Sequence, residues 1–330
     1  MVSKSRFLKA AVFVAGLAVA GKAYAVEQWD MLVYLPLESK VYEPLAKFVE
    51  DVKEKTKGEV VITMRPPGEL PYAPADYHRA VGSGEAAIAD TAYITADIAA
   101  AGALTLPLLL KDEDEMAKVV DVIKPDIEAA LGGFGDELLA WSTYAPTLLW
   151  GTGTPLTSID GLEGLKTRTL NPQVTGILTA LGAIPVTLAS PEVMSAVQYG
   201  TVDAILTANY GLTFAKWVNS FEWGYNVQFS MTPTFLIVNK KAMERLSPEN
   251  QKIIRNLALE YQNMLPVFMK GLEDQAREEI KAAGLTVAEV SPEDRQKIEA
   301  AASGIWEEWA QRRGGDAPQI LEKIRAVVNR

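Results

Sequence analysis

The sequence predicts an α/β protein of two domains, and three observations carry that prediction. Short β-branched runs alternate with helical periodicity in two stretches, residues 27–131 and 138–206, which favours a largely parallel sheet with helices on both faces. At 330 residues, the chain is longer than a single hydrophobic core normally supports. Residues 247–330 are almost entirely helix-forming, so long C-terminal helices should close the chain.

The first alternation begins with a predicted strand over residues 27–34, followed by a helix that ends at Gly58. A β-branched strand over residues 60–64 is then broken by the turn Pro66-Pro67-Gly68. The same order of elements continues with a helix over residues 75–81, a strand near 87–89 and a helix over 113–131.

The second alternation starts near Leu138, and a helix from Pro172 to Gly182 lies inside it. Its predicted strands cover residues 147–150, 166–170 and 202–206, and a further strand is expected over 234–239. Three Ser-Pro-Glu sequences mark helix starts, because serine is a preferred N-cap and proline is favoured at the first helical position. They begin at Ser190, Ser247 and Ser291, and we interpret these serines as caps and not as nucleophiles.

The N-terminus has the three parts of a secretory signal peptide. Basic residues before position 10 are followed by an apolar run over residues 10–20 and by Ala23-Tyr24-Ala25, a small-x-small cleavage site. A membrane anchor is the alternative, but the run is shorter than the roughly 20 residues that a spanning helix needs. We therefore expect residues 1–25 to be removed, and the mature chain to be periplasmic and not inserted in the membrane.

Composition excludes several kinds of chemistry. Removing residues 1–25 takes away four basic residues and no acidic one, so the net charge falls from −10 to −14, which argues against nucleic acid as a partner. The chain has no cysteine, and its single histidine, His78, cannot form a multi-histidine metal centre. We expect no metal, no cofactor and no catalytic residue. His78, beside Arg79 on a predicted helix, is interpreted as a solvated or partly packed side chain.

One arginine is a candidate anion-binding residue. Arg168 lies near the end of the predicted strand over residues 166–170, and ligand sites in open α/β sheets lie outside the carboxyl ends of the strands. A planar guanidinium with five donors suits a carboxylate, and in an acidic protein a buried arginine would concentrate positive potential locally. The alternative is an ordinary surface or ion-paired arginine.

Four spaced blocks surround this arginine. They are Gly164-Leu165-Lys166-Thr167-Arg168, Gly182-Ala183-Ile184-Pro185, Glu192-Val193 and Ala196-Val197-Gln198-Tyr199-Gly200-Thr201-Val202-Asp203. Weaker matches elsewhere are Thr56-Lys57-Gly58, Pro67-Gly68-Glu69-Leu70, Val81-Gly82-Ser83-Gly84-Glu85 and Leu106-Pro107-Leu108-Leu109. Together these blocks resemble the solute-binding proteins of tripartite ATP-independent periplasmic (TRAP) transporters, the DctP-like family, over nearly all of the mature chain.

The resemblance implies a type II-like periplasmic binding protein fold, in which the chain crosses more than once between two α/β domains and the ligand cleft lies between them. We expect domain I to comprise residues 26–146 and 234–272, and domain II to comprise residues 147–233 and 273–330. The resemblance also implies that Arg168 holds the carboxylate of the ligand and that the domains close by hinge rotation. A TRAP permease with small and large membrane subunits, driven by an ion gradient, would receive the solute.

Some positions match the family and others depart from it. Asn171 matches a family position that can contact the ligand, and an N-cap role before Pro172 is compatible with that contact. Where the family often has asparagine, four residues beyond the Val-Asp pair, this chain has Thr207, with Asn209 nearby. Some members carry a second arginine about twenty residues before the first, whereas residues 147–150 contain none. These departures argue against a dicarboxylate held by two arginines.

A single cation among apolar and aromatic groups favours a monocarboxylate with a hydrophobic or aromatic body. The candidate aromatic residues lie at predicted strand ends or in the loops that follow, and they are Tyr93, Trp150, Tyr210, Trp217 and Phe235. Packing in the core or at a domain surface is the alternative for each of them. Loops that line the cleft in similar proteins add Glu38, Glu69 and Tyr72 as candidate contacts.

The function predicted on these grounds is periplasmic capture of a small organic acid for a TRAP permease. Two alternatives stay open. The first is a secreted enzyme, such as a lyase or isomerase, that uses Arg168 to hold its substrate, although the chain has no recognisable acid/base set. The second is a binding component that feeds a signalling receptor.

Overall fold

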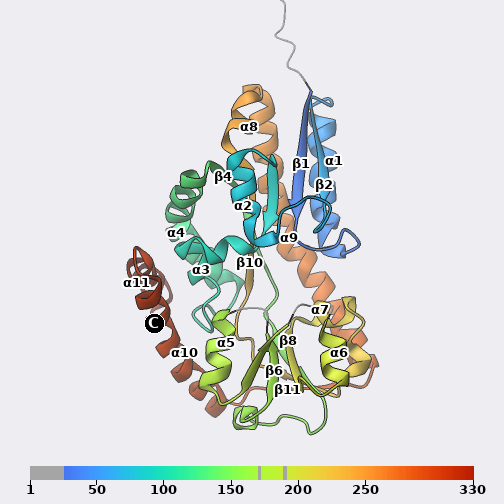
Figure 1. Cartoon of the computed structure of the whole chain (residues 1–330), viewed down its shortest axis with the longest axis vertical. Coiled ribbons are helices and arrows are strands. Elements are labelled where there is room, and N and C mark those ends of the chain that lie inside the picture. The colour runs from blue at the N-terminus through green and yellow to red at the C-terminus, as the bar shows by residue number, and fades with distance from the viewer. Residues whose placement is uncertain (1–25, 170–171, 189–191) are drawn as a thin grey trace, which may run out of the picture.

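Two α/β lobes, each built on one sheet, form the molecule (Figure 1). The computed structural model describes residues 26–169, 172–188 and 192–330. The predicted signal peptide, residues 1–25, the candidate contact Asn171 and the predicted cap Ser190 lie outside the described residues. No helix in the described part of the chain has the length and apolar character needed to cross a membrane. The predicted α/β class is confirmed.

The first lobe contains a five-stranded sheet with the strand order β2-β1-β3-β10-β4. Its strands are β1 (Glu27–Val33), β2 (Val60–Arg65), β3 (Ile88–Thr91), β4 (Asp136–Tyr144) and β10 (Thr232–Asn239). The helices of this lobe are α1 (Glu43–Lys55), α2 (Tyr77–Ser83), α3 (Ala99–Ala103), α4 (Glu113–Phe134) and α8 (Lys240–Arg245). Successive residues of β1 face opposite cores: Met31 and Val33 share a cluster with residues of α1, and Leu32 shares another with residues of α2 and α4.

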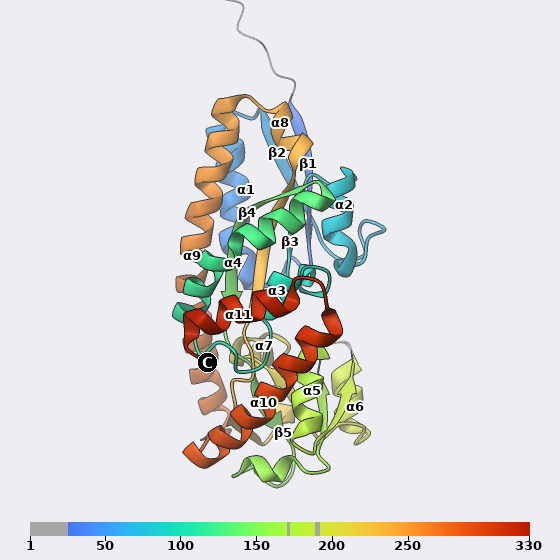
Figure 2. The same ribbon diagram turned by 90° about the vertical axis from the view of Figure 1, so that its left-hand side faces the viewer.

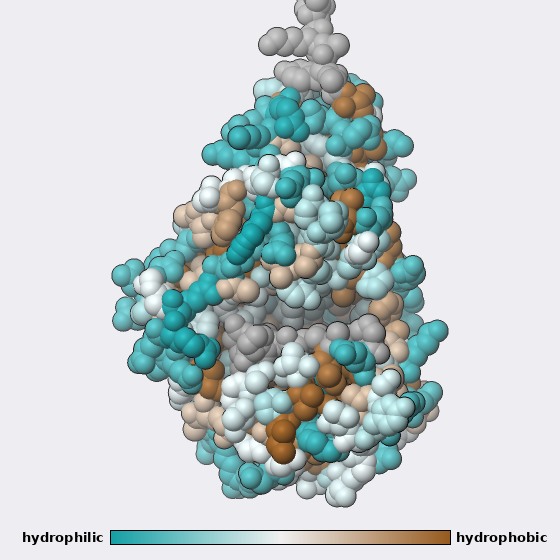
Figure 3. All heavy atoms as spheres, viewed as in Figure 1, coloured by the Kyte–Doolittle hydropathy of each residue, from teal (hydrophilic) through white to brown (hydrophobic). Residues whose placement is uncertain are grey.

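The second lobe contains a six-stranded sheet with the strand order β11-β9-β5-β8-β6-β7. Its strands are β5 (Leu148–Gly151), β6 (Lys166–Thr169), β7 (Ile184–Thr187), β8 (Ala204–Thr207), β9 (Trp223–Asn226) and β11 (Thr286–Glu289). Its helices include α5 (Pro172–Ala180), α6 (Val193–Gln198) and α7 (Asn209–Phe214). In the view of Figure 3, hydrophilic side chains cover most of the upper lobe, and hydrophobic residues form a strip on the lower one.

Among the described strands, one in each sheet runs against its neighbours. β10 is antiparallel to β3 and β4, and β5 is antiparallel to β8 and β9, while the remaining pairs are parallel. β5 and β10 each directly follow a strand of the other lobe. The chain therefore enters the sheet at the edge that faces the other lobe, where the neighbouring parallel strands end. The prediction that the second alternation starts near Leu138 is wrong, because β4, which contains Leu138, pairs with β10 in the first sheet.

Three long helices close the chain, as predicted. They are α9 (Pro248–Ala282), which runs through both lobes, α10 (Pro292–Arg313) and α11 (Ala317–Val328) (Figure 1). The predicted N-caps are confirmed for the first two, because the Ser247 hydroxyl accepts a hydrogen bond from Asn250 N at 3.2 Å and that of Ser291 accepts one from Asp294 N at 3.0 Å. The long helix α9 also contains Pro266.

The two last helices connect the lobes on one side of the molecule (Figure 2). α10 starts on the second lobe, where the Asp294 carboxylate accepts a hydrogen bond from Tyr225 Oη at 2.9 Å, and it later reaches the first lobe, where Trp306 Nε1 donates to Pro107 O at 2.8 Å. α11 packs against α3 and α4 of the first lobe. The sequence assigned residues 273–330 to domain II; we keep the domain boundaries as a proposal, and this packing favours placing α11 with domain I.

Candidate functional site

Strands from both sheets end at a cavity of about 420 Å³ between the lobes. Tyr34 directly follows β1, Tyr144 is the last residue of β4, Arg168 is next to last in β6, and Thr207 is the last residue of β8. All four line the cavity. Because the parallel strands of each sheet end at one edge, the two edges together place side chains from distant segments around one space.

Arg168 is a buried cation in this cavity. Its side chain is 2% exposed, and its Nε donates a hydrogen bond to Leu188 O at 3.1 Å. β6 lies between β7 and β8, which fixes the backbone at this position. Burial lowers the pKa of Arg168 to about 10, so the guanidinium is still charged at neutral pH. The alternative of an ordinary surface arginine is therefore wrong, whereas burial does not decide against an ion-paired one.

Tyrosines of the first lobe form an aromatic wall beside the guanidinium. The Tyr34 ring lies edge-on to the ring of Tyr93 at 5.9 Å and to that of Tyr144 at 6.5 Å, measured between centroids. Burial raises the pKa of each of the three hydroxyls, and for Tyr93 the charge of Arg168 acts in the opposite direction. These hydroxyls are therefore neutral hydrogen-bonding groups at neutral pH.

A second group of aromatic residues comes from α7 and the turn that follows it. Tyr210 and Phe214 stack with their centroids 5.6 Å apart, and Trp217 is only 7% exposed. All three line the cavity. The cavity therefore has a polar end on the strand termini and apolar walls on the helix, a combination typical of small-molecule sites.

Glu273 on α9 is the acidic residue of the cavity lining, and it holds the start of α7. It is 5% exposed, and its carboxylate accepts hydrogen bonds from Asn209 Nδ2 at 2.8 Å and from Tyr210 N at 3.0 Å. A carboxylate is favourable beside the first N–H groups of a helix. Since α7 carries Tyr210 and Phe214, Glu273 positions two residues of the cavity wall.

The structure brings part of the predicted site together. The residues that line one cavity are Arg168, Thr207, Tyr210 and Trp217. Tyr93 lies beside them, close enough for the charge of Arg168 to act on its hydroxyl. Ligand contact by these five residues stays a prediction.

Three other predicted residues lie close by but do not line this cavity. Trp150 is fully buried on β5, and its Nε1 donates to Thr207 O at 3.0 Å, so it supports the end of β8 from behind. Phe235 is fully buried in the core because it lies mid-strand in β10, between β3 and β4. Asn209 is held by Glu273 and lines a second groove instead. For Trp150 and Phe235, the alternative of core packing describes the arrangement better.

The predicted loop residues of the first lobe lie elsewhere. Glu38 lines a hollow of about 210 Å³ together with Tyr210, outside the lining of the arginine cavity. Glu69 forms an ion pair with Arg65. Tyr72 packs against the edge of the first-lobe core, where Glu85 contributes to a raised pKa of its hydroxyl.

Sequence reasoning missed several residues of the cavity lining, and two kinds of signal could have found them. Tyr34 and Tyr144 each stand at the carboxyl end of a strand in the first half of the chain, and this position is the same signal that identifies Arg168 in the second lobe. Glu273 lies on the face of α9 that also carries the buried Met269 and Ala276, and a lone acid in an apolar stripe needs a partner.

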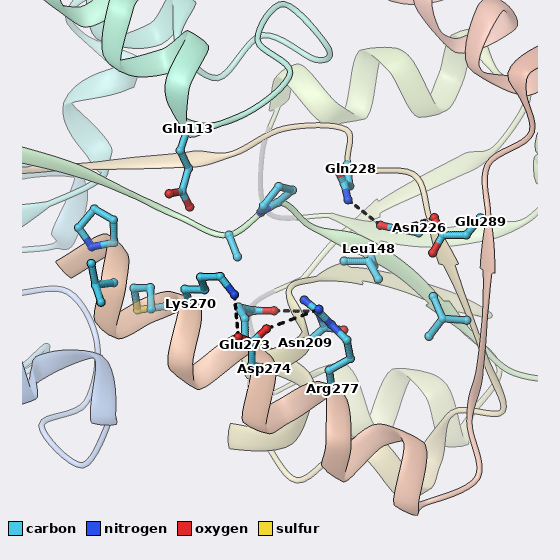
Figure 4. A pocket seen from close by; sticks show the side chains of 16 residues that line it. Glu113, Leu148, Asn209, Asn226, Gln228, Lys270, Glu273, Asp274, Arg277 and Glu289 are labelled. Atoms are coloured by element: carbon cyan, nitrogen blue, oxygen red, sulfur yellow. Dashed lines mark hydrogen bonds and ion pairs between the residues drawn. The ribbon is translucent and has the colours of Figure 1, made fainter. Parts of the chain in front are cut away.

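A larger groove of about 660 Å³ lies beside α9, next to residues 145–148 and 226–228, where the chain passes between the lobes (Figure 4). We call it the hinge-side groove. Its charged and amide groups pair with one another: Lys270 with Asp274 at 2.8 Å, Arg277 with Asp274 at 3.5 Å, and Asn226 with Glu289 at 2.9 Å. Glu273 borders this groove as well as the arginine cavity. The cations Lys270 and Arg277 of this groove are thus already paired with a carboxylate.

His78 has a structural role. It is fully buried on α2, its Nε2 lies 2.9 Å from the Asp97 carboxylate, and its ring is edge-on to Phe134 at 5.0 Å. Burial lowers the pKa of this imidazole. The expectation of a solvated or partly packed histidine is thus corrected to a fully packed one, because α4 covers the face of α2 on which it lies.

Comparisons with known proteins agree with this architecture. The model of the DctP family, described as bacterial extracellular solute-binding protein, family 7, matches residues 33–312. The 2,3-diketo-L-gulonate-binding periplasmic protein YiaO of Escherichia coli is 24% identical over 86% of this chain and 88% of its own length.

Solved structures share the fold at low identity. DctP7 of Bordetella pertussis, an extracytoplasmic solute receptor binding pyroglutamic acid, superimposes with a TM-score of 0.81 at 21% identity, covering 90% of this chain and 99% of that one. A TRAP solute-binding protein from an unidentified marine microbe, specific for aromatic acid ligands and in complex with 3-hydroxybenzoate, gives a TM-score of 0.80 at 21% identity, covering 92% and 98%.

The family match spans most of the chain, and the two-lobed fold with its interlobe cavity agrees with it. Members of this family are binding proteins for transport and not enzymes. This chain therefore belongs to the DctP family of bacterial extracellular solute-binding proteins.

Proposed function

We propose that this protein captures a small organic monocarboxylate with a hydrophobic or aromatic body in the cavity between its lobes, and that Arg168 binds the carboxylate. The observation that carries the proposal is the burial of this guanidinium in the lining of that cavity. A planar guanidinium in a cavity shielded from water can bind a ligand carboxylate in bidentate geometry, and such charge-assisted pairs are among the stronger hydrogen bonds in proteins. The apolar side chains of α7 suit the rest of the ligand.

Closure of the lobes would complete the site. Arg168 lies on the second lobe and Tyr34 and Tyr144 on the first, so a ligand in this cavity would bridge the two lobes and favour their closed arrangement. A ligand shifts the open and closed populations only by its difference in affinity for them. A charge-assisted pair shielded from water provides such a difference.

The partner in this proposal is a TRAP permease in the inner membrane, which would take the solute from the closed protein. Residues 1–25 would direct the chain to the periplasm. The names of the relatives support this assignment, since one is a periplasmic binding protein and another a TRAP solute-binding protein. Uptake by cells that lack this chain, compared with cells that carry it, tests the delivery step.

A melting screen against monocarboxylates and dicarboxylates tests the binding step, with native mass spectrometry to count bound ligands. A ligand at 100 times its Kd should stabilise the protein by about 2.7 kcal/mol, which raises the melting temperature measurably. Arg168→Ala should abolish the shift. A melting shift that persists in Arg168→Ala would remove this residue from the site, and conversion of the acid into a product would identify an enzyme instead.

A further inference from the structure

A hydrogen bond crosses between the lobes beside the arginine cavity. Lys40 N donates to Tyr210 Oη at 3.1 Å. Lys40 begins the 3₁₀ turn Lys40–Tyr42, which follows β1 in the first lobe, whereas Tyr210 lies on α7 in the second. The two residues are 170 positions apart in the chain, so this bond depends on how the lobes are placed relative to each other.

The first-lobe partner is held by its own segment. Leu35 N donates to Tyr42 Oη at 2.8 Å, and Tyr42 is 3% exposed in the core of the first lobe. These contacts fix the segment on both sides of Lys40. The N–H of Lys40 is a first N–H group of a helical turn, which has no acceptor within that turn, and Tyr210 supplies the acceptor from the other lobe.

The second-lobe partner is held at its backbone and at its ring. Tyr210 N donates to Glu273 Oε1 at 3.0 Å, and the Tyr210 ring stacks on Phe214 with an angle of 22° between the planes. The side chain also packs against the core cluster that contains residues of β1, α1 and α9. Because the ring is already ordered, little side-chain entropy is lost when its hydroxyl pairs with Lys40.

Both partners belong to segments that line the arginine cavity. The lining residues are Leu35, Pro36, Ser39 and Val41 from the first lobe and Tyr210, Gly211 and Phe214 from α7 and its end. The separation of these two segments sets the width of the cavity on this side. A bond that fixes their separation therefore also fixes how closely the two lobes enclose a solute.

The contact lies between the cavity and the neighbouring hollow of about 210 Å³. Tyr210 and Phe214 line both spaces, and Lys40 lines the smaller one, together with Leu272 and Ala276 of α9. Among the described residues, Lys40 is not part of the cavity lining. The N–H of Lys40 can therefore be removed without removing a group from the cavity.

We propose that Tyr210 is a positioning residue, whose hydroxyl latches the lobes together through Lys40 N and so slows release of the bound solute. This inference rests on the proposed function, because it takes the solute to bind in the arginine cavity. The latch stabilises the arrangement in which both lobes enclose the solute, and the apparent affinity rises with the population of that arrangement. It does not require the Tyr210 hydroxyl to touch the solute.

The first test removes the acceptor. Tyr210→Phe keeps the ring but has no hydroxyl. Stopped-flow fluorescence can follow release of 3-hydroxybenzoate and of pyroglutamate, since Trp217 lines the cavity. We expect the dissociation rate to rise about threefold to tenfold, the range for one net hydrogen bond, while the association rate changes by less than about twofold.

The second test removes the donor, because a tyrosine that contacts the solute would give the same result in the first. Lys40→Pro lacks the N–H, and proline is tolerated at the first position of a helical turn after an extended residue, here Ser39 with ψ 121°. Its reference is Lys40→Ala, which loses the same side chain and keeps the N–H. Lys40→Pro should release the probes about threefold to tenfold faster than this reference. Combining it with Tyr210→Phe should add nothing, because both changes remove one bond.

A third measurement needs no ligand. Spin labels at Lys53→Cys and Tyr199→Cys place one probe on each lobe at exposed positions of a chain without cysteine. Double electron–electron resonance then measures the distance between the lobes. Tyr210→Phe and Lys40→Pro should each lower the ratio of short to long distances about threefold to tenfold relative to the wild type and Lys40→Ala, respectively.

The outcomes separate the latch from the proposed function. Equal release rates in Lys40→Pro and Lys40→Ala would overturn the latch, and faster release in Tyr210→Phe alone would then assign this hydroxyl to solute contact. If neither probe binds, unchanged distances in Lys40→Pro would overturn it. Retention of a probe by Arg168→Ala would instead overturn the proposed function, and the ligand-free distances would still decide the latch.

Discussion

The two hollows that border α9 differ in how deeply their charged groups are buried. In the hinge-side groove, Lys270 and Arg277 already pair with Asp274, and all three side chains are about half exposed or more. In the smaller interlobe cavity, Arg168 is buried at the end of a central strand. The larger hollow is therefore the weaker candidate for the solute site, because its cations are exposed whereas the cation of the interlobe cavity is buried.

The largest effect should come from changing the cation of the interlobe cavity. Arg168→Ala should weaken carboxylate binding by at least about 100-fold, because a buried ligand carboxylate would lose its counter-charge. Arg168→Lys should still lose about tenfold, since an ammonium cannot reproduce the planar fork. Titration calorimetry with a ligand found in the melting screen measures both. Equal affinity of the lysine variant and the wild type would mean that charge alone suffices.

Glu273 borders both hollows, and its replacement tests how much its carboxylate contributes to the stability of α7. Glu273→Ala would leave Asn209 Nδ2 and Tyr210 N without their acceptor, and the free energy of unfolding should fall by about 2–3 kcal/mol. Glu273→Gln keeps one oxygen acceptor and should lose about half as much. Urea unfolding measures the difference. An alanine variant as stable as the wild type would show that α7 does not depend on this carboxylate.

The buried acids behind the tyrosine wall should make stability depend on pH. Burial raises the pKa of Asp90 to about 7, so the folded state holds this proton more tightly than the unfolded chain. The resulting stability is full below the ordinary pKa of an aspartate and is lost as the pH rises toward 7. Between pH 4.5 and 7.5, the free energy of unfolding should fall by about 1–3 kcal/mol less in Asp90→Asn than in the wild type. Unfolding experiments at the two pH values measure this difference.

Two other acids sharpen this measurement. Asp136 is also buried, and its pKa is raised to about 7. Its carboxyl group therefore also makes the free energy of unfolding fall as the pH rises, and Asp90→Asn removes only part of this pH dependence. Asp274 in the hinge-side groove has its pKa lowered by Lys270, so its contribution has the opposite sign and is lost as the pH falls. If stability depends on pH identically in Asp90→Asn and the wild type, the raised pKa of Asp90 does not cause part of that dependence.

The smallest effect is expected in the hinge-side groove. Lys270→Ala removes one exposed ion pair, and such pairs contribute little because water and salt screen them. Ligand affinity and the unfolding midpoint should both stay within experimental error of the wild type. A loss of affinity greater than about threefold would show that this groove takes part in solute binding.

The sequence was sufficient for the fold class and for the position of Arg168 near the carboxyl end of a strand, and the reasons are local. Alternating strand and helix periodicity predicts each lobe, and an arginine at the carboxyl end of a strand predicts a site near the sheet edge. Ser247 and Ser291 were identified as caps because capping depends on a few neighbouring residues.

The remainder depended on tertiary pairing, which local patterns do not contain. Leu138 reads as the start of a second unit, but its strand pairs with β10, almost 100 residues later in the chain. Trp150 and Phe235 are aromatic residues near predicted strand ends, yet both face the core. Tyr34 and Tyr144 line the same cavity as Arg168 only because the two sheets bring their strand ends together.

The attachment of α11 has a practical consequence for anyone who builds a fluorescent sensor on this scaffold. Lys323 of α11 pairs with Asp126 at 2.8 Å, and the Arg330 guanidinium contacts Leu109 O and the Glu115 carboxylate, so the carboxyl terminus reports the position of the first lobe. A dye fused there and another on the first sheet would keep a constant separation. The second dye belongs on the lobe that carries Arg168, for example at the exposed Tyr199, where energy transfer can follow closure.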